Sequence, residues 1–117
     1  MLTNNPIAAE LFSVQYNVEF FDEIVLVLLM AARDYVHLGH KLLTHPQASS
    51  IAPNQNPYRS LIITDEAFSL DLESLKLIEA AIAVYSKINT KKADIPQDVA
   101  KDFMVIDCEM IKAVKLT

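Results

Sequence analysis

A single glycine, Gly39, occurs in this chain of 117 residues, and this scarcity limits the sites that the chain can form. A dinucleotide-binding fingerprint needs several glycines, because the backbone must approach a pyrophosphate closely, and a P-loop needs two. The sequence contains neither pattern, and the CxxC, HExxH and EF-hand patterns of metal sites are also missing from it. We therefore expect no metal and no cofactor.

Composition and charge are typical of an ordered chain with an acidic surface. Hydrophobic residues make up 52% of the sequence, which supplies a sizeable core, and the length suits one domain over residues 1–117. The formal net charge of −5 repels phosphate backbones. We therefore expect a single domain that does not bind nucleic acid.

The cysteine content and the length of the apolar runs indicate where in the cell the protein is located. Cys108 is the only cysteine, so no intrachain disulfide can form, as is typical of a reducing cytosol. The longest apolar run, Ile24 to Ala32, is much shorter than the roughly 20 residues that a membrane-spanning helix needs. The first residues lack the basic segment that opens a signal peptide. We expect a soluble, cytoplasmic protein with no membrane partner.

Hydrophobic patterning predicts alternating strands and helices. Asn5-Pro6 is typical of a helix start, because Asn is a good N-cap and Pro suits the first helical position. Gly39 is typical of a left-handed residue just after a helix. The last helix should bury one stripe of side chains, formed by Val99, Phe103, Ile106, Met110 and Val114. The expected strands are 1–3, 17–20, 40–44 and 61–64, and the expected helices are 5–12, 22–38, 69 or 71 to about 90, and 96 onward.

Strand–helix alternation favours an α/β fold with three layers, in which helices cover both faces of a mostly parallel sheet of about four strands. One connection departs from this pattern. Residues 47–59 show no helical period, and they contain Pro53 and Pro57. Such a segment can close a wide hairpin, so the sequence leaves open whether the strand at 61–64 is parallel or antiparallel.

Polar residues follow two of the expected strands. Thr3-Asn4-Asn5 ends the first strand and Thr44-His45 ends the third, and α/β folds place ligands beyond the carboxyl ends of strands. A helix N-terminus at the same edge favours an anion. The following loop, as a lid, adds further donors. We therefore expect one site for a small anionic ligand, formed by Thr3, Asn4, Asn5, Thr44, His45, Asn54, Tyr58 and Arg59.

Each of these residues also has a purely structural interpretation. Asn5 is a helix cap and Asn4 a turn residue in that interpretation. His45 is then bonded to a nearby carbonyl, and Arg59 forms a surface ion pair with an acid such as Asp65. The sequence does not separate the two interpretations.

Polar motifs in the first 64 residues carry a family resemblance. They are TNNP at Thr3–Pro6, RDY at Arg33–Tyr35 with His37, GHKLLTHP at Gly39–Pro46, and Pro53-Asn54 with Pro57-Tyr58 and Ser60. Together they resemble the GrdX family, which comprises small proteins encoded with the selenium-dependent glycine, sarcosine and betaine reductases of anaerobic bacteria. The resemblance implies an accessory role near amino-acid reductive metabolism, and it implies no catalytic mechanism.

Three functions fit these features. The first is an accessory protein that binds a small anionic ligand, or a protein of a reductase complex, at the predicted site. The second is a small enzyme that uses His45 as acid or base, with Arg59 as an anion anchor. The sequence does not show a full set of nucleophile, base and orienting residue for it. The third is a structural interaction module. The helix at 22–38 carries apolar residues on more faces than one packing surface uses, so we also expect a homodimer.

Overall fold

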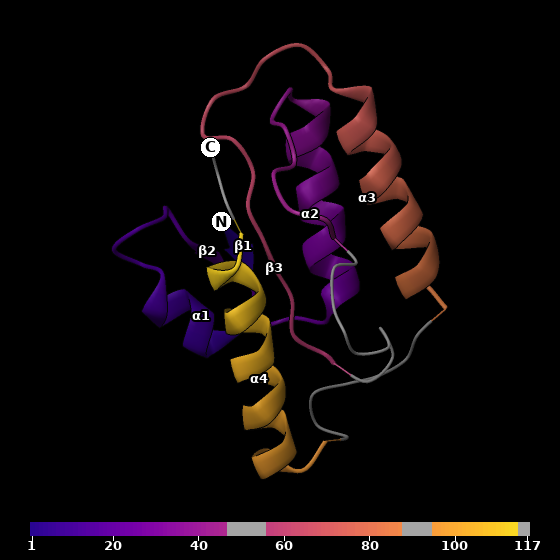
Figure 1. Cartoon of the computed structure of the whole chain (residues 1–117). Coiled ribbons are helices and arrows are strands. Elements are labelled where there is room, and N and C mark those ends of the chain that lie inside the picture. Colours follow the sequence, from indigo (N-terminus) through magenta and orange to yellow (C-terminus); the bar gives the residue numbers. More distant parts are fainter. Residues whose placement is uncertain (47–55, 88–94, 115–117) are drawn as a thin grey trace.

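The computed structural model describes residues 1–46, 56–87 and 95–114, which form three short strands and four helices. The strands are β1 (Leu2–Thr3), β2 (Glu19–Phe20) and β3 (Ser60–Leu61). The helices are α1 (Pro6–Leu11), α2 (Val25–His37), α3 (Leu72–Tyr85) and α4 (Gln97–Lys112). Half of the described residues are helical, whereas each strand has only two residues (Figure 1).

The sheet is small and mixed. β1 lies in its centre and pairs in parallel with β2, with Leu2 opposite Glu19. On its other side β1 pairs antiparallel with β3, with Leu2 opposite Leu61. The predicted three-layer α/β fold with a mostly parallel sheet of about four strands is therefore wrong. The last predicted strand, whose direction the sequence left open, runs antiparallel to β1.

The predicted third strand is reduced to one β-bridge, between Leu42 and Ile63. Side-chain oxygens satisfy backbone groups that a longer ladder would use. The N–H of Lys41 donates to Thr64 Oγ1 at 2.9 Å, and the N–H of Ile62 donates to Thr44 Oγ1 at 3.1 Å. Because Ser and Thr side chains compete in this way with strand pairing, the apolar pattern of this segment overstated its strand length.

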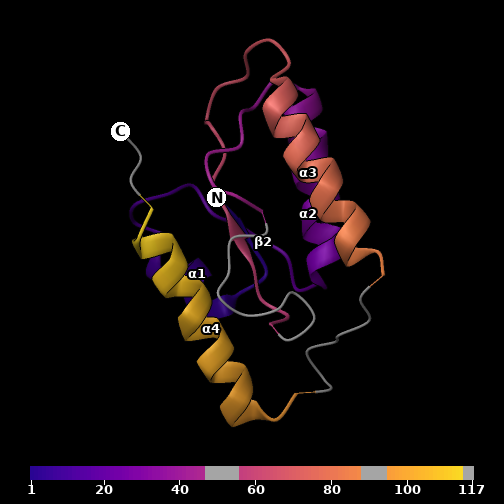
Figure 2. The same ribbon diagram turned by 45° about the vertical axis from the view of Figure 1, so that its right-hand side comes forward.

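Successive strand residues point to opposite faces, so the strands contribute to two hydrophobic clusters. On one side Leu2 and Leu61 pack with α2 and α3. On the other side Met1 and Ile62 pack with α1 and α4. Figures 1 and 2 show the strands between these two pairs of helices. The residues directly after β1 and those directly before β3 therefore lie where the two pairs of helices meet.

The end of α2 confirms the predicted role of Gly39. Its φ of 107° lies in the left-handed region. Its N–H donates to the carbonyl of Val36 at 3.0 Å, and the N–H of His40 donates to the carbonyl of Tyr35 at 3.0 Å. This pair of hydrogen bonds is a Schellman motif, which satisfies carbonyls at the end of the helix. The turn brings the chain back toward Thr44 and His45.

The buried face of α4 differs from the predicted stripe. Val99 is 38% exposed, whereas the buried residues of the helix are Ala100, Asp107, Cys108 and Ile111. The inward face is thus offset by one residue along the helix. Apolar patterning missed this offset because the face that packs inward contains a carboxylate.

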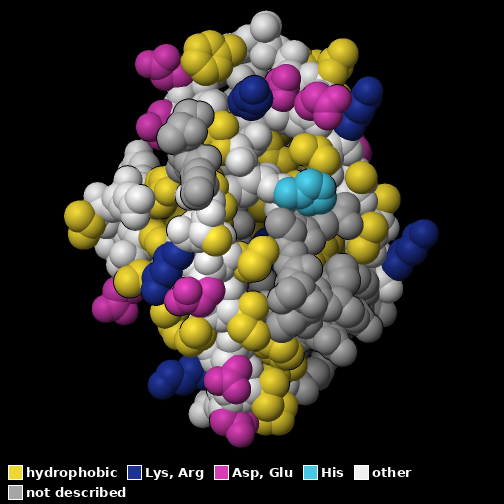
Figure 3. Space-filling view, viewed as in Figure 1, with side chains coloured by type: hydrophobic (Ala, Val, Ile, Leu, Met, Phe, Trp, Pro, Cys, Tyr) yellow, Lys and Arg dark blue, Asp and Glu magenta, His cyan; other side chains and the backbone are white. Residues whose placement is uncertain are grey.

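The surface mixes apolar and charged side chains. In the space-filling view, hydrophobic side chains lie among acidic and basic ones over α4 (Figure 3).

Within the described ranges, no helix is both long enough and apolar enough to cross a bilayer.

Candidate functional site

The three polar residues that end β1 are completely buried. Thr3, Asn4 and Asn5 each have an exposed fraction of 0%. Thr3 Oγ1 lies 2.7 Å from Ser60 Oγ and accepts the N–H of Asn5 at 3.0 Å. These contacts hold the chain between β1 and α1 against β3.

Asn4 joins three segments through its side chain. Its Nδ2 donates to the carbonyls of Glu23 and Pro57, at 3.0 and 2.9 Å. Its Oδ1 accepts the N–H of Arg59 at 2.8 Å. The amide therefore ties β1 to the start of α2 and to the chain that enters β3, and these three bonds all run to protein backbone.

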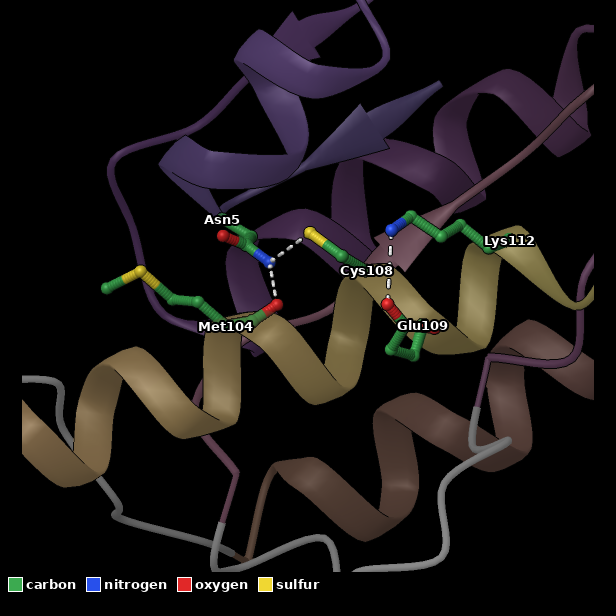
Figure 4. Close-up of polar contacts among 5 residues, drawn as sticks. All are labelled: Asn5, Met104, Cys108, Glu109 and Lys112. Atoms are coloured by element: carbon green, nitrogen blue, oxygen red, sulfur yellow. Dashed lines mark hydrogen bonds and ion pairs between the residues drawn. The ribbon is translucent and has the colours of Figure 1, made fainter.

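Asn5 acts both as a helix cap and as a bridge to α4. Its Oδ1 accepts the N–H groups of Ile7 and Ala8, at 3.0 and 3.4 Å, which satisfies two of the donors at the start of α1. Its Nδ2 donates to the carbonyl of Met104 at 2.9 Å and points toward Cys108 Sγ at 3.7 Å (Figure 4). The N-terminus of α1 is thus capped by the protein itself.

Asp107 is the main polar group that sequence reasoning missed. It lies on α4 and is only 4% exposed. Its Oδ2 accepts hydrogen bonds from Ser60 Oγ at 2.6 Å and from Asn5 Nδ2 at 3.0 Å. Burial raises the pKa of this carboxyl, while the two donors and the charge of Arg59 act in the opposite direction.

A cavity of about 310 Å³ opens beside this carboxyl, and we call it the Asp107 cavity. Its walls are the chain at Leu43–His45, the start of β3 and the C-terminal half of α4. Polar lining comes from Thr44, His45, Arg59, Ser60 and Asp107. Apolar lining comes from Leu43, Met110, Ile111, Ala113 and Val114. Small-molecule sites commonly combine apolar walls with a few polar groups that fix the orientation of the ligand.

Arg59 lies inside the protein rather than on its surface. It is 3% exposed, its Nη2 donates to the hydroxyl of Tyr85, and its guanidinium carbon lies 5.8 Å from the centre of the Tyr85 ring. Tyr58 is buried too, and its N–H donates to Asn56 Oδ1 at 2.9 Å. Burial raises the pKa of the Tyr58 hydroxyl.

The predicted site residues therefore occupy three kinds of position. Thr44, His45 and Arg59 line the Asp107 cavity, and His45 is exposed there. Thr3 and Asn5 support the cavity wall from behind through Ser60 and Asp107, whereas Asn4 and Tyr58 are not among the residues that line it. The predicted lid spans residues 47–59, and its residues 47–55, which include Asn54, lie outside the described residues.

A sequence signal for Asp107 did exist. Asp107 is four residues from Phe103 and four from Ile111, which places it on the same side of a helix as both. An acid within an apolar stripe is unusual, because a buried charge is costly without partners. The chain before α1 offers the partner, since Asn5 lies beside it in the structure.

A second hollow, of about 260 Å³, is lined in part by Glu19, Tyr35, His40 and Asp65. The Tyr35 hydroxyl donates to Glu19 Oε2 at 2.5 Å, which raises the pKa of Tyr35. His40 Nδ1 lies 2.7 Å from the carbonyl oxygen of Thr64. Among the described residues, no group of three His, Cys, Asp or Glu side chains is arranged to hold a metal ion.

Comparison with protein families gives a match over almost the whole chain. A protein-family model described as GrdX-like protein matches residues 1–115. No curated protein and no solved structure matches the chain. The family match covers every residue of the candidate site.

Proposed function

Since this chain belongs to the GrdX-like family, we propose that it is an accessory protein of amino-acid reductive metabolism that binds a small ligand in the Asp107 cavity. The proposed link to reductase metabolism rests on the family resemblance of the motifs TNNP and GHKLLTHP. The observation that carries ligand binding is the buried pair of Ser60 and Asp107 in the wall of a cavity. Three of the residues expected from sequence, Thr44, His45 and Arg59, line the same cavity.

A thermal-shift screen of small metabolites tests this proposal, because a ligand that binds only the folded state raises the melting temperature. The matched variants are Leu43→Trp and Leu70→Trp. Leu43 lines the cavity and is 41% exposed, whereas Leu70 is 47% exposed and does not line it. A ligand of the cavity should stabilise the wild type and Leu70→Trp but not Leu43→Trp. Equal stabilisation of all three proteins would place the ligand elsewhere.

The alternative function is catalysis by a small enzyme with His45 as acid or base. It is favoured by the presence of His45 and the buried carboxyl of Asp107 on the same cavity. Their roles would differ, because His45 is exposed to solvent while Asp107 is enclosed. Incubating each ligand from the screen with the protein, and following it by NMR, separates the two functions. If the wild type converts a ligand and His45→Ala does not, the protein is an enzyme that depends on His45.

Self-association through α2 is a further proposal. Ile24, Val27 and Met30 recur at steps of three and are 41%, 37% and 43% exposed. They form an apolar strip on the side of α2 away from its buried residues. A second copy of the chain would cover this strip in a homodimer.

A further inference from the structure

The carboxyl of Asp107 has neutral hydrogen-bond donors but no ion-pair partner in the described part of the chain. Asn5 and Ser60 donate to it, and neither carries a charge. The salt bridges of the described residues join Arg33 to Glu79 and Lys112 to Glu109, not a cation to Asp107. Without a cation in direct contact, the charge of the ionised carboxyl is compensated only in part by its neutral donors and by the charge of Arg59.

The two side-chain donors bind the same carboxylate oxygen. Ser60 Oγ lies 2.6 Å from Asp107 Oδ2, and Asn5 Nδ2 lies 3.0 Å from the same atom. Asp107 also lines the cavity. A molecule in the cavity that reaches this carboxyl would share it with these two donors and with the backbone N–H of Ser60.

The groups that suggested an anion are engaged within the protein. The first N–H groups of α1 donate to the side chain of Asn5. The guanidinium of Arg59 donates to Tyr85 and lies over its ring. An anion in the cavity would lie beside the carboxylate of Asp107 as well as beside Arg59, and the carboxylate repels it when ionised.

The apolar part of the lining defines the body of the ligand. Leu43, Met110, Ile111 and Val114 present apolar surface to the cavity. A volume of about 310 Å³ is at the lower end of the range of small-molecule sites. The cavity therefore suits a molecule with one polar head and a short apolar body.

We propose that the ligand of the Asp107 cavity is a small organic amine, bound as its ammonium form in an ion pair with Asp107. This inference rests on the proposed ligand-binding function and specifies its ligand class. The ammonium supplies a cation in direct contact with the carboxylate, and its N–H groups donate to the carboxylate. The apolar body of the amine replaces water against Met110 and Val114.

Three probes of equal chain length test the head group: n-butylammonium, n-butanol and n-butyrate. Binding is followed at about pH 7 by the NMR shifts of the Met110 methyl and the Val114 methyls, which lie at the cavity. The protein is compared with Asp107→Asn and with Asp102→Asn, an exposed acid on the same helix. n-Butylammonium should bind the wild type and Asp102→Asn, and its affinity should fall by at least about 10-fold in Asp107→Asn. n-Butyrate should not bind.

The outcomes separate the ligand class from the proposed function. Binding of n-butanol or n-butyrate at the cavity with equal or greater affinity overturns the amine and leaves ligand binding intact. If no probe or screened metabolite shifts the cavity signals, both proposals fail. If Asp107→Asn does not fold, the carboxyl carbon shift of Asp107 is titrated in the wild type. Its pKa should fall when n-butylammonium is present, and an unchanged pKa contradicts the ion pair.

Discussion

The hydroxyl of Ser60 donates a hydrogen bond of 2.6 Å to Oδ2 of Asp107, and this contact joins β3 to the middle of α4. Ile62 and Cys108, which follow these two residues closely in sequence, belong to the apolar cluster that α1 and α4 form. The carboxyl is 4% exposed, so its hydrogen bonds have little competition from water. The ionisation of Asp107 should therefore affect both stability and binding.

Stability should depend on pH through Asp107. Burial raises its pKa in the folded protein above the ordinary value of 3.8, so the folded state holds this proton to higher pH than the unfolded chain does. The contribution of this group therefore becomes unfavourable as pH rises from about 4 through the folded-state pKa. Urea unfolding between about pH 3.5 and 7 should show wild-type stability falling relative to Asp107→Asn, which cannot ionise.

The difference between the two proteins isolates this group, because other acids titrate in both. Asp71, for example, has its pKa lowered mainly by a hydrogen bond from Ser74, and its contribution has the opposite sign. A stability difference that stays constant over the whole range would show that Asp107 has the same pKa folded and unfolded.

Asn5→Ala should reduce the free energy of unfolding by about 2 to 4 kcal/mol. The substitution removes the cap of α1, and it also removes a donor from the buried carboxyl of Asp107. Ser13→Ala is the control, because its hydroxyl bonds to the Glu10 carbonyl at an exposed position. Chemical denaturation of both variants measures the effect. A loss below about 1 kcal/mol would mean that water replaces both contacts of Asn5.

Gly39→Ala should destabilise the protein by at least about 2 kcal/mol. The φ of 107° is unfavourable for any side chain, and an added Cβ would lie 1.8 Å from the carbonyl oxygen of Phe68. Ser86→Ala is a suitable comparison, since Ser86 ends α3 in a right-handed conformation at an exposed position. Equal melting temperatures for the two variants would contradict the close approach of Phe68 to Gly39.

Local signals in the sequence predicted the helices better than the sheet. Asn5, Gly39 and Asp71 mark helix ends, and each has the capping geometry expected of its residue type. The strands are two residues long, and side-chain hydroxyls such as those of Thr64 and Thr44 take up neighbouring backbone donors. Such contacts join distant parts of the chain, so apolar patterning carries no sign of them.

The candidate site was predictable only in part, for a related reason. Thr44 and His45 lie at the cavity, since the bridge at Leu42 directs this segment beside β3. The spacing of Asp107 from Phe103 and Ile111 was visible in the sequence, but the apolar stripe indicated a face of α4 offset by one residue. Asn5 fixes the inward face by bonding to Met104 and Asp107.

The proposed homodimer predicts an effect of charge on the strip of α2. Val27→Lys with Met30→Lys should reduce self-association and leave the fold unchanged, because both side chains are partly exposed. Sedimentation at high protein concentration measures the mass. The control replaces Val105 with Lys, since it is 44% exposed on α4. A wild type that sediments only as the 13.1 kDa monomer would exclude the homodimer.

His45→Ala should weaken ligand binding at the Asp107 cavity and change the free energy of unfolding by no more than about 0.5 kcal/mol. His45 lines the cavity but is exposed, and exposed positions contribute little to the fold. His37→Ala is the matched control, because His37 is an exposed histidine at the end of α2 that does not line the cavity. Affinity for a ligand from the metabolite screen and urea unfolding are measured on both variants. A stability loss of about 2 kcal/mol or more in His45→Ala would instead show that this histidine is a structural hydrogen-bonding residue.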